Sequence, residues 1–448
     1  MSLGSTSSGL LTDKYELTMV QAALTSGTAG RRCVFEVFAR RLPAGRRYGV
    51  VGGTGRLLDA IEDFGFGPTE IDHLREDGVV DQRTLDWLTS YRFGGDIWGY
   101  GEGECYVPGS PLLVVEGSFA DAVVLETLVL SVLNHDSAIA AAAARMITAA
   151  GTRPCIEMGS RRTHELAAVA AARAAYVAGF ASTSNLEAAR SYGIPSTGTA
   201  AHAFTLLHDD ERAAFTAQIA AQGAGTTVLV DTYDVTEAVR VAVEIAGPAL
   251  GAVRLDSGDL LAQAHAVRAQ LDALGATRTR IVVTSDLDEH AIAALAAAPV
   301  DAYGVGTNLV TGSGAPTAGL VYKLVARAVS DQPGAPMLQV AKASSAKTTL
   351  GGRKWALRRR SSAGVAEAEV IGVETEPVDD GDDRPLMRRL VTDGVLVGRE
   401  SLQDARTRHA ASLAELPPEA RQLSRGEPAI PTRYERSPHR RTEDQEPP

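Results

Sequence analysis

Cysteine is scarce in this 448-residue chain, and so is any excess of positive charge. The three cysteines, Cys33, Cys105 and Cys155, are widely separated and form no CxxC pair. An odd number at such intervals fits neither a disulfide framework nor a zinc site. Lysine and arginine total 44 against 55 aspartates and glutamates, a net charge of −11. Without a cationic excess to pair with phosphates, we expect neither a nucleic-acid partner nor binding to an anionic membrane.

Targeting and membrane-spanning patterns are missing as well. The segment MSLGSTSSGLLTDKYE at the start has no basic stretch followed by an apolar one, which predicts no signal peptide. The long apolar stretch LLVVEGSFADAVVLETLVLSVL is interrupted by Glu116, Asp121 and Glu126, too often for a membrane span. At 45% hydrophobic and 22% charged residues, the composition is that of an ordinary globular protein. We therefore expect a cytoplasmic location.

A strand–helix unit recurs from about residue 152 to about residue 325. In each unit a short apolar run ends in polar residues or glycine, and an alanine-rich helical stretch follows. The seven run ends are RPCIEMGSRR, YVAGFASTSN, IPSTGTAAHAF, TTVLVDTYD, GAVRLDSGD, RIVVTSDLDE and DAYGVGTNL. Steps between them range from 17 residues (Ser182 to Thr199) to 32 (Thr199 to Asp231). That is the length of a strand plus a crossover helix.

Such units in series predict a parallel sheet covered by helices, either an open sheet or a barrel. An open sheet concentrates its ligand chemistry at one switch point, whereas the strand ends of a barrel ring one mouth. Polar residues follow all seven runs here, so we expect an irregular parallel α/β barrel. The flanks mix helical and strand patterns and are expected to form one discontinuous α/β domain.

The expected boundaries follow from this division of the chain. Residues 1–145 and 331–435 would form the two parts of the flanking domain, and residues 146–330 the barrel with the active site. The charged, proline-containing residues 436–448 are expected to be a disordered tail.

Several strand ends carry candidate binding residues. In VRLDSGDL, Arg254 and Asp256 alternate along the strand and therefore point to the same side. The DSGD turn that follows suits ribose hydroxyls or a hydrated Mg²⁺, but it suits a helix cap equally well. The glycines of YGVGTNL are placed to let backbone N–H groups contact a phosphate, although such glycines often serve only a tight turn.

Other strand ends add charge and a titratable group. Adjacent arginines in EMGSRRTHE suit a carboxylate or phosphate. The motifs LVDTYD and VTSDLDE supply aspartates, whose mutual repulsion a ligand that carries a cation would relieve. His202 stands among small residues in STGTAAHAF, where it is either a satisfied half-buried histidine or a nucleophile or general base. Together these residues predict a barrel enzyme that acts on a phosphorylated sugar or nucleotide.

In order along the chain, eight motifs resemble nicotinate phosphoribosyltransferases, which belong to the type II phosphoribosyltransferases. They are LLTDKYELTM, FEVFARRLPAGRRYGVVGG, EMGSRRTHE, STGTAAHAF, LVDTYDV, VRLDSGDL, TSDLDE and YGVGTNLVTG. They cover residues 10 to about 325, and ELPPEARQLSRG (415–426) is also similar to the family's C-terminal region. Each motif is weak alone, but eight in the family's order are specific.

The resemblance implies an ATP-dependent ligase and glycosyltransferase of NAD biosynthesis. Such an enzyme forms nicotinate mononucleotide and diphosphate from nicotinate and 5-phosphoribosyl diphosphate, with Mg²⁺, through a phosphohistidine that matches His202. It further implies a homodimer with shared active sites, in which Tyr15 stacks on the pyridine ring in the neighbouring subunit.

The resemblance also implies site residues. Asp256 would act in catalysis with His202 and, together with Asp286, hold ribose or Mg²⁺. The substrate-binding set comprises Tyr15, Met158, Arg161, Thr199, Asp231, Arg254, Ser285, Asp286, Gly304, Gly306 and Thr307.

One departure and three alternatives remain at this point. Met158 stands where relatives commonly have an aromatic residue, which affects affinity for the ring; a thioether can still contact a ring edge. Nicotinamide phosphoribosyltransferase is an alternative, but Ser184 stands where an acidic residue is expected for a neutral amide. Quinolinate phosphoribosyltransferase is a shorter chain without the histidine. A non-catalytic nucleotide-binding barrel is the alternative of another class, yet His202 and Asp256 are both present.

Overall fold

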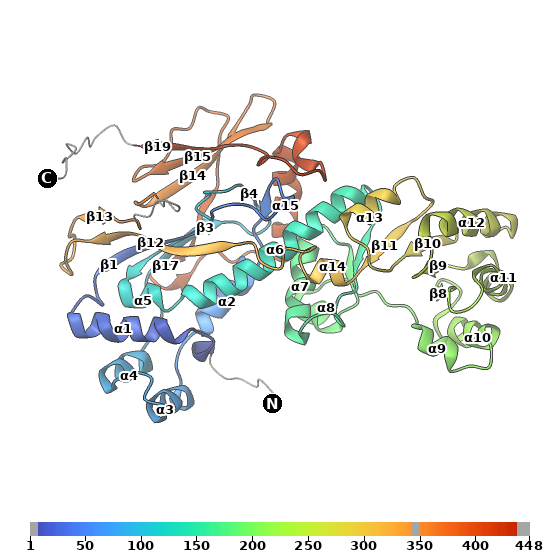
Figure 1. Ribbon diagram of the computed structural model, residues 1–448, viewed down its shortest axis with the longest axis horizontal. Helices are drawn as coiled ribbons and strands as arrows, with labels where there is room; N and C mark the ends of the chain where they lie inside the picture. Colours follow the sequence, from blue (N-terminus) through green and yellow to red (C-terminus); the bar gives the residue numbers. More distant parts are fainter. Residues whose placement is uncertain (1–7, 343–349, 437–448) are drawn as a thin grey trace. The chain divides into compact units, whose positions relative to one another are not determined.

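The computed structural model describes residues 8–342 and 350–436, and it divides into two compact units. Residues Ala138–Pro316 form the barrel unit, and the chain on both sides of them forms the flanking unit (Figure 1). The boundaries therefore lie at 137/138 and 316/317, whereas we expected them at 145/146 and 330/331. The second shift arises because Leu320–Ala328 is a strand that pairs with Arg32–Ala39 of the flanking unit. The expected tail, 436–448, lies outside the described residues except for Arg436.

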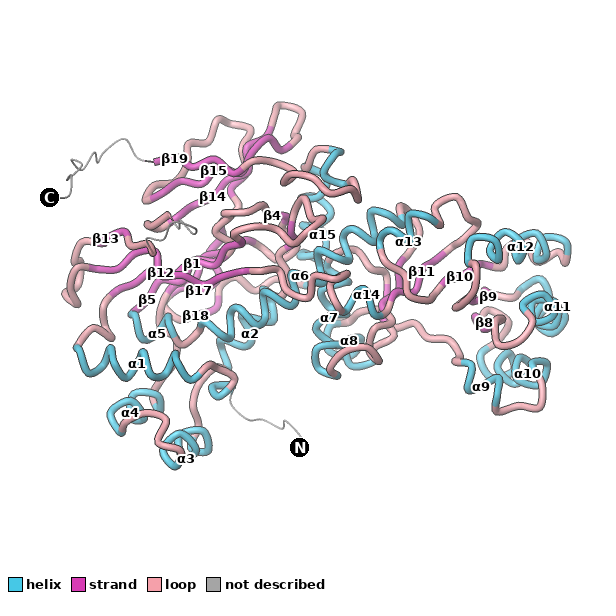
Figure 2. The backbone as a smooth tube through the Cα atoms, in the orientation of Figure 1, coloured by secondary structure: helices cyan, strands magenta, loops and turns pink. Residues whose placement is uncertain are grey.

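The barrel unit is built on a six-stranded parallel sheet that curls into a half-barrel (Figure 2). Its strand order is β7-β6-β11-β10-β9-β8, and every neighbouring pair is parallel. The strands are β6 (Cys155–Glu157), β7 (Ser182–Thr183), β8 (Thr227–Leu229), β9 (Ala252–Leu255), β10 (Arg280–Val283) and β11 (Ala302–Val305). They are short and mostly buried, as parallel strands covered on both faces must be.

The seventh expected strand is not formed. The run IPSTGTAAHAF makes a single parallel bridge, Thr183 to Ser196, and otherwise lacks ladder pairing. Pro195 and Gly198, with small residues between and after them, give this run little preference for a strand. The sheet is consequently open between β7 and β8, and residues 197–201 are left as a loop that leads to His202.

Helices connect the strands, and most begin at a polar cap. They are α7 (Glu165–Val177), α8 (Leu186–Tyr192), α9 (His202–Leu206), α10 (Glu211–Gln222), α11 (Val235–Ala246), η2 (Gly247–Ala249), α12 (Leu260–Ala273), α13 (Glu289–Ala294) and α14 (Thr307–Val310). The side chains of Asp234, Asp259 and Asp288 accept hydrogen bonds from the first turns of α11, α12 and α13. The second aspartate of each of the motifs DTYD, DSGD and DLD is therefore a helix N-cap.

The flanking unit contains a seven-stranded antiparallel sheet of order β13-β12-β1-β5-β3-β17-β18. Its strands are β1 (Arg32–Ala39), β3 (Asp96–Tyr100), β5 (Leu113–Ser118), β12 (Leu320–Ala328), β13 (Met337–Gln339), β17 (Met387–Thr392) and β18 (Val395–Leu396). Helices on one face bury a large apolar core that includes Leu17, Phe35, Leu57 and Tyr322. These helices are α1 (Lys14–Ser26), α2 (Thr54–Asp63), α3 (Pro68–Glu76), α4 (Gln82–Thr89) and α5 (Phe119–Val123).

A four-stranded sheet, β16-β14-β15-β19, completes the flanking unit. Its strands are β14 (Lys354–Arg360), β15 (Ala366–Val373), β16 (Arg384–Pro385) and β19 (Thr432–Arg436), and the remaining elements are β2 (Gly49–Val50), β4 (Cys105–Tyr106), α15 (Leu402–Glu415), η1 (Ser8–Leu10) and η3 (Pro418–Arg421). Lys354 of β14 and Glu36 of β1 form an ion pair of 2.7 Å, with side chains 3% and 2% exposed. This buried pair ties the two sheets together.

The long helix α6 (Glu126–Ala150) carries the boundary between the units. Together with α5 it forms the one helical segment among the described residues, Phe119–Ala150, that is long and apolar enough to cross a bilayer. Of its most apolar window, 67% is buried within the fold, as expected for a core helix.

Candidate active site

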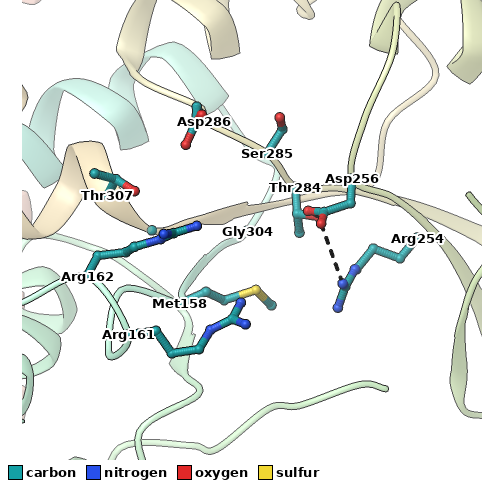
Figure 3. Close-up of a pocket in the computed structure, with 11 residues that line it drawn as sticks. Met158, Arg161, Arg162, Arg254, Asp256, Thr284, Ser285, Asp286, Gly304 and Thr307 are labelled. Carbon is teal, nitrogen blue, oxygen red and sulfur yellow. Dashed lines mark hydrogen bonds and ion pairs between the residues drawn. The ribbon is translucent and has the colours of Figure 1, made fainter. Parts of the chain in front are cut away.

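The barrel unit holds a pocket at the C-terminal ends of β6, β9, β10 and β11 (Figure 3). It encloses about 240 Å³. Nine of the residues selected from the sequence line it: Met158, Arg161, Arg254, Asp256, Ser285, Asp286, Gly304, Gly306 and Thr307. Arg162 and Thr284, which the sequence-based selection omitted, complete the lining. Because the carboxyl ends of parallel strands meet at one edge of the sheet, residues up to 149 positions apart (158 to 307) converge here.

Three guanidinium groups make the pocket attractive to anions. Arg161 and Arg162, from the loop after β6, and Arg254, from β9, approach it from opposite sides in Figure 3. Arg161 and Arg162 are exposed, and neither has a carboxylate within 4.0 Å among the described residues. Guanidinium groups without an internal partner are free to bind a carboxylate or phosphate bidentately.

Arg254 is held in place from two sides. Its Nη1 donates to the hydroxyl of Thr199 and to the carbonyl of Ala200, and its Nη2 lies 3.9 Å from Oδ2 of Asp256. Burial, with a smaller effect of Arg161, lowers the pKa of Arg254, while Asp256 and Asp231 oppose that shift. The side chain is 13% exposed, and its Nε is a buried donor without a partner in the described structure. A ligand oxygen is the natural acceptor for such a group.

His202, the first residue of α9, lies beside the pocket and is joined to its wall by Asp256. Its Nε2 is 4.0 Å from Oδ1 of Asp231 and 3.9 Å from Oδ2 of Asp256, while its Nδ1 is 3.2 Å from the hydroxyl oxygen of Thr232. The ring is 40% exposed, so an incoming group can reach it. An accessible imidazole between two carboxylates is equipped to accept a phosphoryl group or a proton.

Asp231 is nearly inaccessible, with a side chain 3% exposed. Its Oδ2 accepts hydrogen bonds from the backbone N–H of Asp256 (3.0 Å) and the hydroxyl of Ser257 (2.7 Å). Its Oδ1 has no hydrogen-bond donor in the described structure and faces the imidazole of His202. Asp231 thus fixes the start of the DSGD turn with one oxygen and presents the other to the histidine.

The first aspartates of the three acidic motifs and the capping aspartates have different roles. Asp256 lines the pocket and accepts a hydrogen bond from the hydroxyl of Thr284, and Asp286 lines the pocket with an exposed side chain. The structure therefore confirms the capping interpretation for the second aspartate of each motif, while the binding roles of Asp256 and Asp286 stay predictions. As oxygen donors, Asp256 and Asp286 suit Mg²⁺.

Close packing explains why position 304 of β11 is a glycine. A Cβ on Gly304 of β11 would lie 2.5 Å from Cγ2 of Thr284 and 2.8 Å from Sδ of Met158. Ser285 beside them has a φ of 116°, a strained conformation for a residue with a side chain. Gly306 is the N-cap of α14 and Thr307 its first residue; because this helix has only four residues, the contribution of a helix dipole to phosphate binding is small.

Tyr15 belongs to the flanking unit, on α1, and its side chain is 45% exposed. Partial burial and the neighbouring carboxylates of Glu126, Glu16 and Asp13 raise its pKa to about 12. The phenol is therefore neutral over the physiological range and offers an accessible ring.

Four residues of the site and its supporting loop were not selected from the sequence. Arg162 stands next to Arg161 in EMGSRR, so the doubled arginine was itself the signal. Thr232 and Thr284 contact His202 and Asp256, but a threonine at a strand end is too common to be singled out. Glu157, whose pKa burial raises, accepts hydrogen bonds from Thr183 and from the backbone of Gly159 and so orders the loop that carries the arginines.

A parallel half-barrel with arginines, aspartates and a histidine at its strand ends defines a type II phosphoribosyltransferase fold. Comparison with known proteins is more specific. Residues 10–134 match the nicotinate phosphoribosyltransferase N-terminal domain, and residues 154–349 match the nicotinate phosphoribosyltransferase family. The chain belongs to the nicotinate phosphoribosyltransferase family.

Individual relatives agree with this assignment. A nicotinate phosphoribosyltransferase of Mycobacterium tuberculosis is 58% identical over 434 residues, 95% of each chain. That of Bacillus subtilis is 35% identical over 83% of this chain and 77% of its own. The crystal structure of human nicotinic acid phosphoribosyltransferase matches with a TM-score of 0.80 at 26% identity, over 93% of this chain and 96% of that one.

Proposed function

We propose that this protein catalyses the formation of nicotinate mononucleotide and diphosphate from nicotinate and 5-phosphoribosyl diphosphate, as a step of NAD biosynthesis. Support comes from family membership at 58% identity and from a pocket that combines three arginines with aspartates and a neighbouring histidine. The anionic carboxylate of nicotinate suits an arginine-rich lining better than the neutral amide of nicotinamide does. Neither the alternative nicotinamide activity nor a non-catalytic role is favoured by any relative named above.

The single observation that carries the mechanistic part of the proposal is the placement of His202 between Asp231 and Asp256 at the pocket's edge. In the proposed reaction, His202 accepts the γ-phosphoryl group of ATP and releases ADP; later hydrolysis of the phosphohistidine returns inorganic phosphate. Two carboxylates beside the ring stabilise the positive charge that the imidazole gains on phosphorylation.

Substrate roles are assigned by side-chain chemistry. Arg161 and Arg254 hold the nicotinate carboxylate or neighbouring phosphates, and Met158 contacts the pyridine ring. Asp256 and Asp286 bind ribose or Mg²⁺, which supplies charge neutralisation for the diphosphate when bound. The remaining substrate contacts fall to Thr199, Asp231, Ser285, Gly304, Gly306 and Thr307.

The proposal extends to assembly and location. Tyr15 presents an exposed ring from the flanking unit, and we assign it to stacking on the pyridine ring in a second copy of the chain, which implies a homodimer. A cytoplasmic location suits an enzyme that uses ATP and 5-phosphoribosyl diphosphate.

The decisive assay offers radiolabelled nicotinate and nicotinamide in parallel with 5-phosphoribosyl diphosphate and Mg²⁺, each with and without ATP. We expect product from nicotinate, strongly increased by ATP, and none from nicotinamide. Efficient conversion of nicotinamide would transfer the chain to the other activity. Absence of product from both, with folded protein, would leave a non-catalytic barrel.

The role of His202 has its own test. With ATP labelled at the γ-phosphate, the wild type should form an acid-labile phosphoenzyme and His202→Asn should form none. His208→Asn is the matched control, because His208 lies two residues beyond α9 and its Nδ1 contacts the carbonyl of Phe204 at 2.8 Å. Undiminished ATP hydrolysis in His202→Asn would remove the histidine from the mechanism.

A further inference from the structure

A second pocket lies in the flanking unit, where the end of β12 and the starts of β1 and α5 meet the segment after α1. It encloses about 200 Å³ and is lined by Thr28, Arg31, Cys33, Phe119, Leu324 and Arg327. None of these residues belongs to the barrel unit or to the proposed catalytic set. A volume of this size admits a small molecule, well below the 300–1,000 Å³ typical for drug-sized ligands.

A β-bulge places one of the two arginines on the buried face of the sheet. Cys33 of β1 pairs with Arg327 and Phe35 pairs with Leu324, although a regular ladder would put Leu324 and Arg327 on opposite faces. The register shift between Val34 and Phe35 adds one residue to β12 and brings both side chains to the face that the helices cover. Bulges commonly re-aim side chains near functional sites.

Packing on the two faces agrees with this register. Cys33 and Phe35 belong to the core under the helices, and Leu324 packs against it. Val34, Val325 and Ala326 form a separate cluster on the opposite face. Arg327 is therefore a cation on the side of the sheet that is otherwise filled with apolar groups.

The charge of Arg327 is not balanced within the chain that the structure describes. Its guanidinium donates to the carbonyl of Ala328 and has no carboxylate within 4.0 Å among residues 8–342 and 350–436. Arg31, the second arginine, lies 3.4 Å from Asp331, whose side chain is 43% exposed. Leaving a half-buried cation unpaired is costly, so an anion that fills the pocket is stabilised there.

The floor of the pocket is apolar and contains a thiol. Phe119 and Leu324 supply apolar lining, and Cys33 is 2% exposed. Burial raises the pKa of the Cys33 thiol to about 11, against the opposing influence of Arg31 and Arg327, whose charges both act on the sulfur. Two cations thus face the same small apolar hollow from its rim.

We propose that this pocket binds a small organic anion with an apolar body, whose carboxylate or phosphate group pairs with Arg327 and Arg31 while its body packs on Phe119 and Leu324. This site is independent of the proposed function, because it uses none of the residues assigned to that function. Occupancy would close access to Cys33 and tie the end of β12 to the start of β1.

Alkylation of Cys33 is the local readout of this site. Iodoacetamide labelling of the full-length wild type is followed by peptide mass spectrometry, with benzoate, phenyl phosphate or uncharged benzamide as probes. We expect benzoate or phenyl phosphate to slow Cys33 alkylation saturably, and the comparison of the two identifies the preferred anionic group. Cys105 and Cys155 are both fully buried, so slower alkylation of these two thiols would reveal a general stabilisation of the fold by the probe.

Variants distinguish recognition of the probe's anionic group from apolar packing of its ring in the pocket. Arg327→Gln should weaken protection about tenfold or more, the loss expected for a charge-assisted hydrogen bond. Asp331→Asn should strengthen protection, because it frees Arg31 without removing any lining group. Arg32→Gln is the matched control: Arg32 adjoins Arg31 in sequence but pairs with Glu116 at 3.0 Å and does not line the pocket.

Three outcomes would overturn the proposal. Equal protection by benzamide would mean that the pocket recognises no charge. Unchanged protection in both Arg327→Gln and Asp331→Asn would remove the arginines from binding. Loss of benzoate protection in Arg254→Gln would show that benzoate acts through the catalytic pocket instead.

Discussion

Asp231→Asn isolates the electrostatic effect of one carboxylate on the proposed nucleophile. Both hydrogen bonds that Asp231 accepts end on Oδ2, from Asp256 and Ser257, whereas Oδ1 accepts none and lies 4.0 Å from Nε2 of His202. An asparagine can keep its carbonyl oxygen in the Oδ2 position and place its NH₂ group where Oδ1 was. The variant therefore removes the charge beside His202 and retains the local structure.

The size of the effect follows from the separation. Two unit charges 4 Å apart attract by about 1 kcal/mol in water and about 4 kcal/mol at the effective dielectric constant of about 20 found near protein surfaces. Asp231 is 3% exposed but His202 is 40% exposed, so an intermediate value of about 2 kcal/mol is appropriate. Loss of that stabilisation from the transition state lowers the rate of His202 phosphorylation about 30-fold.

Single-turnover phosphorylation with γ-labelled ATP measures this rate, and urea denaturation of the same protein measures its stability. Asp234→Asn is the matched control, because Asp234 caps α11 and asparagine caps a helix as well as aspartate does. We expect Asp231→Asn to keep its unfolding midpoint within the range of the control. A wild-type phosphorylation rate in folded Asp231→Asn, or a large loss of stability, would refute this account of the two oxygens.

Other consequences of the structure are open to direct measurement. Gly304→Ala places a Cβ 2.5 Å from Cγ2 of Thr284 and should cost about 1–3 kcal/mol of stability while raising KM for 5-phosphoribosyl diphosphate, measured by denaturation and steady-state kinetics. Burial and nearby carboxylates raise the pKa of Glu211 to about 7 from 4.5, so the folded state binds its proton more tightly than the unfolded chain does. Stability should then fall as pH rises from about 4.5 to about 7, and Glu211→Gln should flatten that part of a Tm-against-pH profile. Lys354→Met leaves Glu36 buried and unpaired and should cost about 3–5 kcal/mol in urea denaturation. Adding Glu36→Leu should restore most of that loss, and no recovery in the double variant would contradict the burial of the pair.

The order of strands and helices in the barrel unit was predictable because each strand carries its own local signal. Runs such as GAVRL and RIVV are apolar and β-branched, and each is followed by a turn and an alanine-rich helix. The exception, IPSTGTAAHAF, shows the limit of this approach. Its spacing fitted the series, but its residues have little preference for a strand, and a single bridge from Ser196 to Thr183 is all that forms.

Pocket residues were predictable for the same topological reason, whereas their partners were not. Arg254 and Asp256 could be placed at one mouth from strand alternation alone. That Asp231 presents one oxygen to His202 and gives the other to the next turn depends on the register between β8 and β9, where Leu229 pairs with Arg254. Register between strands joined by a helix has no local signal in the sequence.

In the pocket of Arg31 and Arg327, too, the register between strands decides which side chains meet, here in an antiparallel pair. In the strand LVYKLVARA, simple alternation puts Leu324 and Arg327 on opposite faces, and an arginine there is expected to face solvent. One extra residue in β12 opposite the Val34–Phe35 step reverses the side on which Arg327 lies and leaves its charge above a buried thiol. Because a bulge inverts every later side chain of its strand, the face of Arg327 depends on a contact with a strand nearly 300 residues earlier in the chain. A site built on such a contact is visible only after the chain has folded.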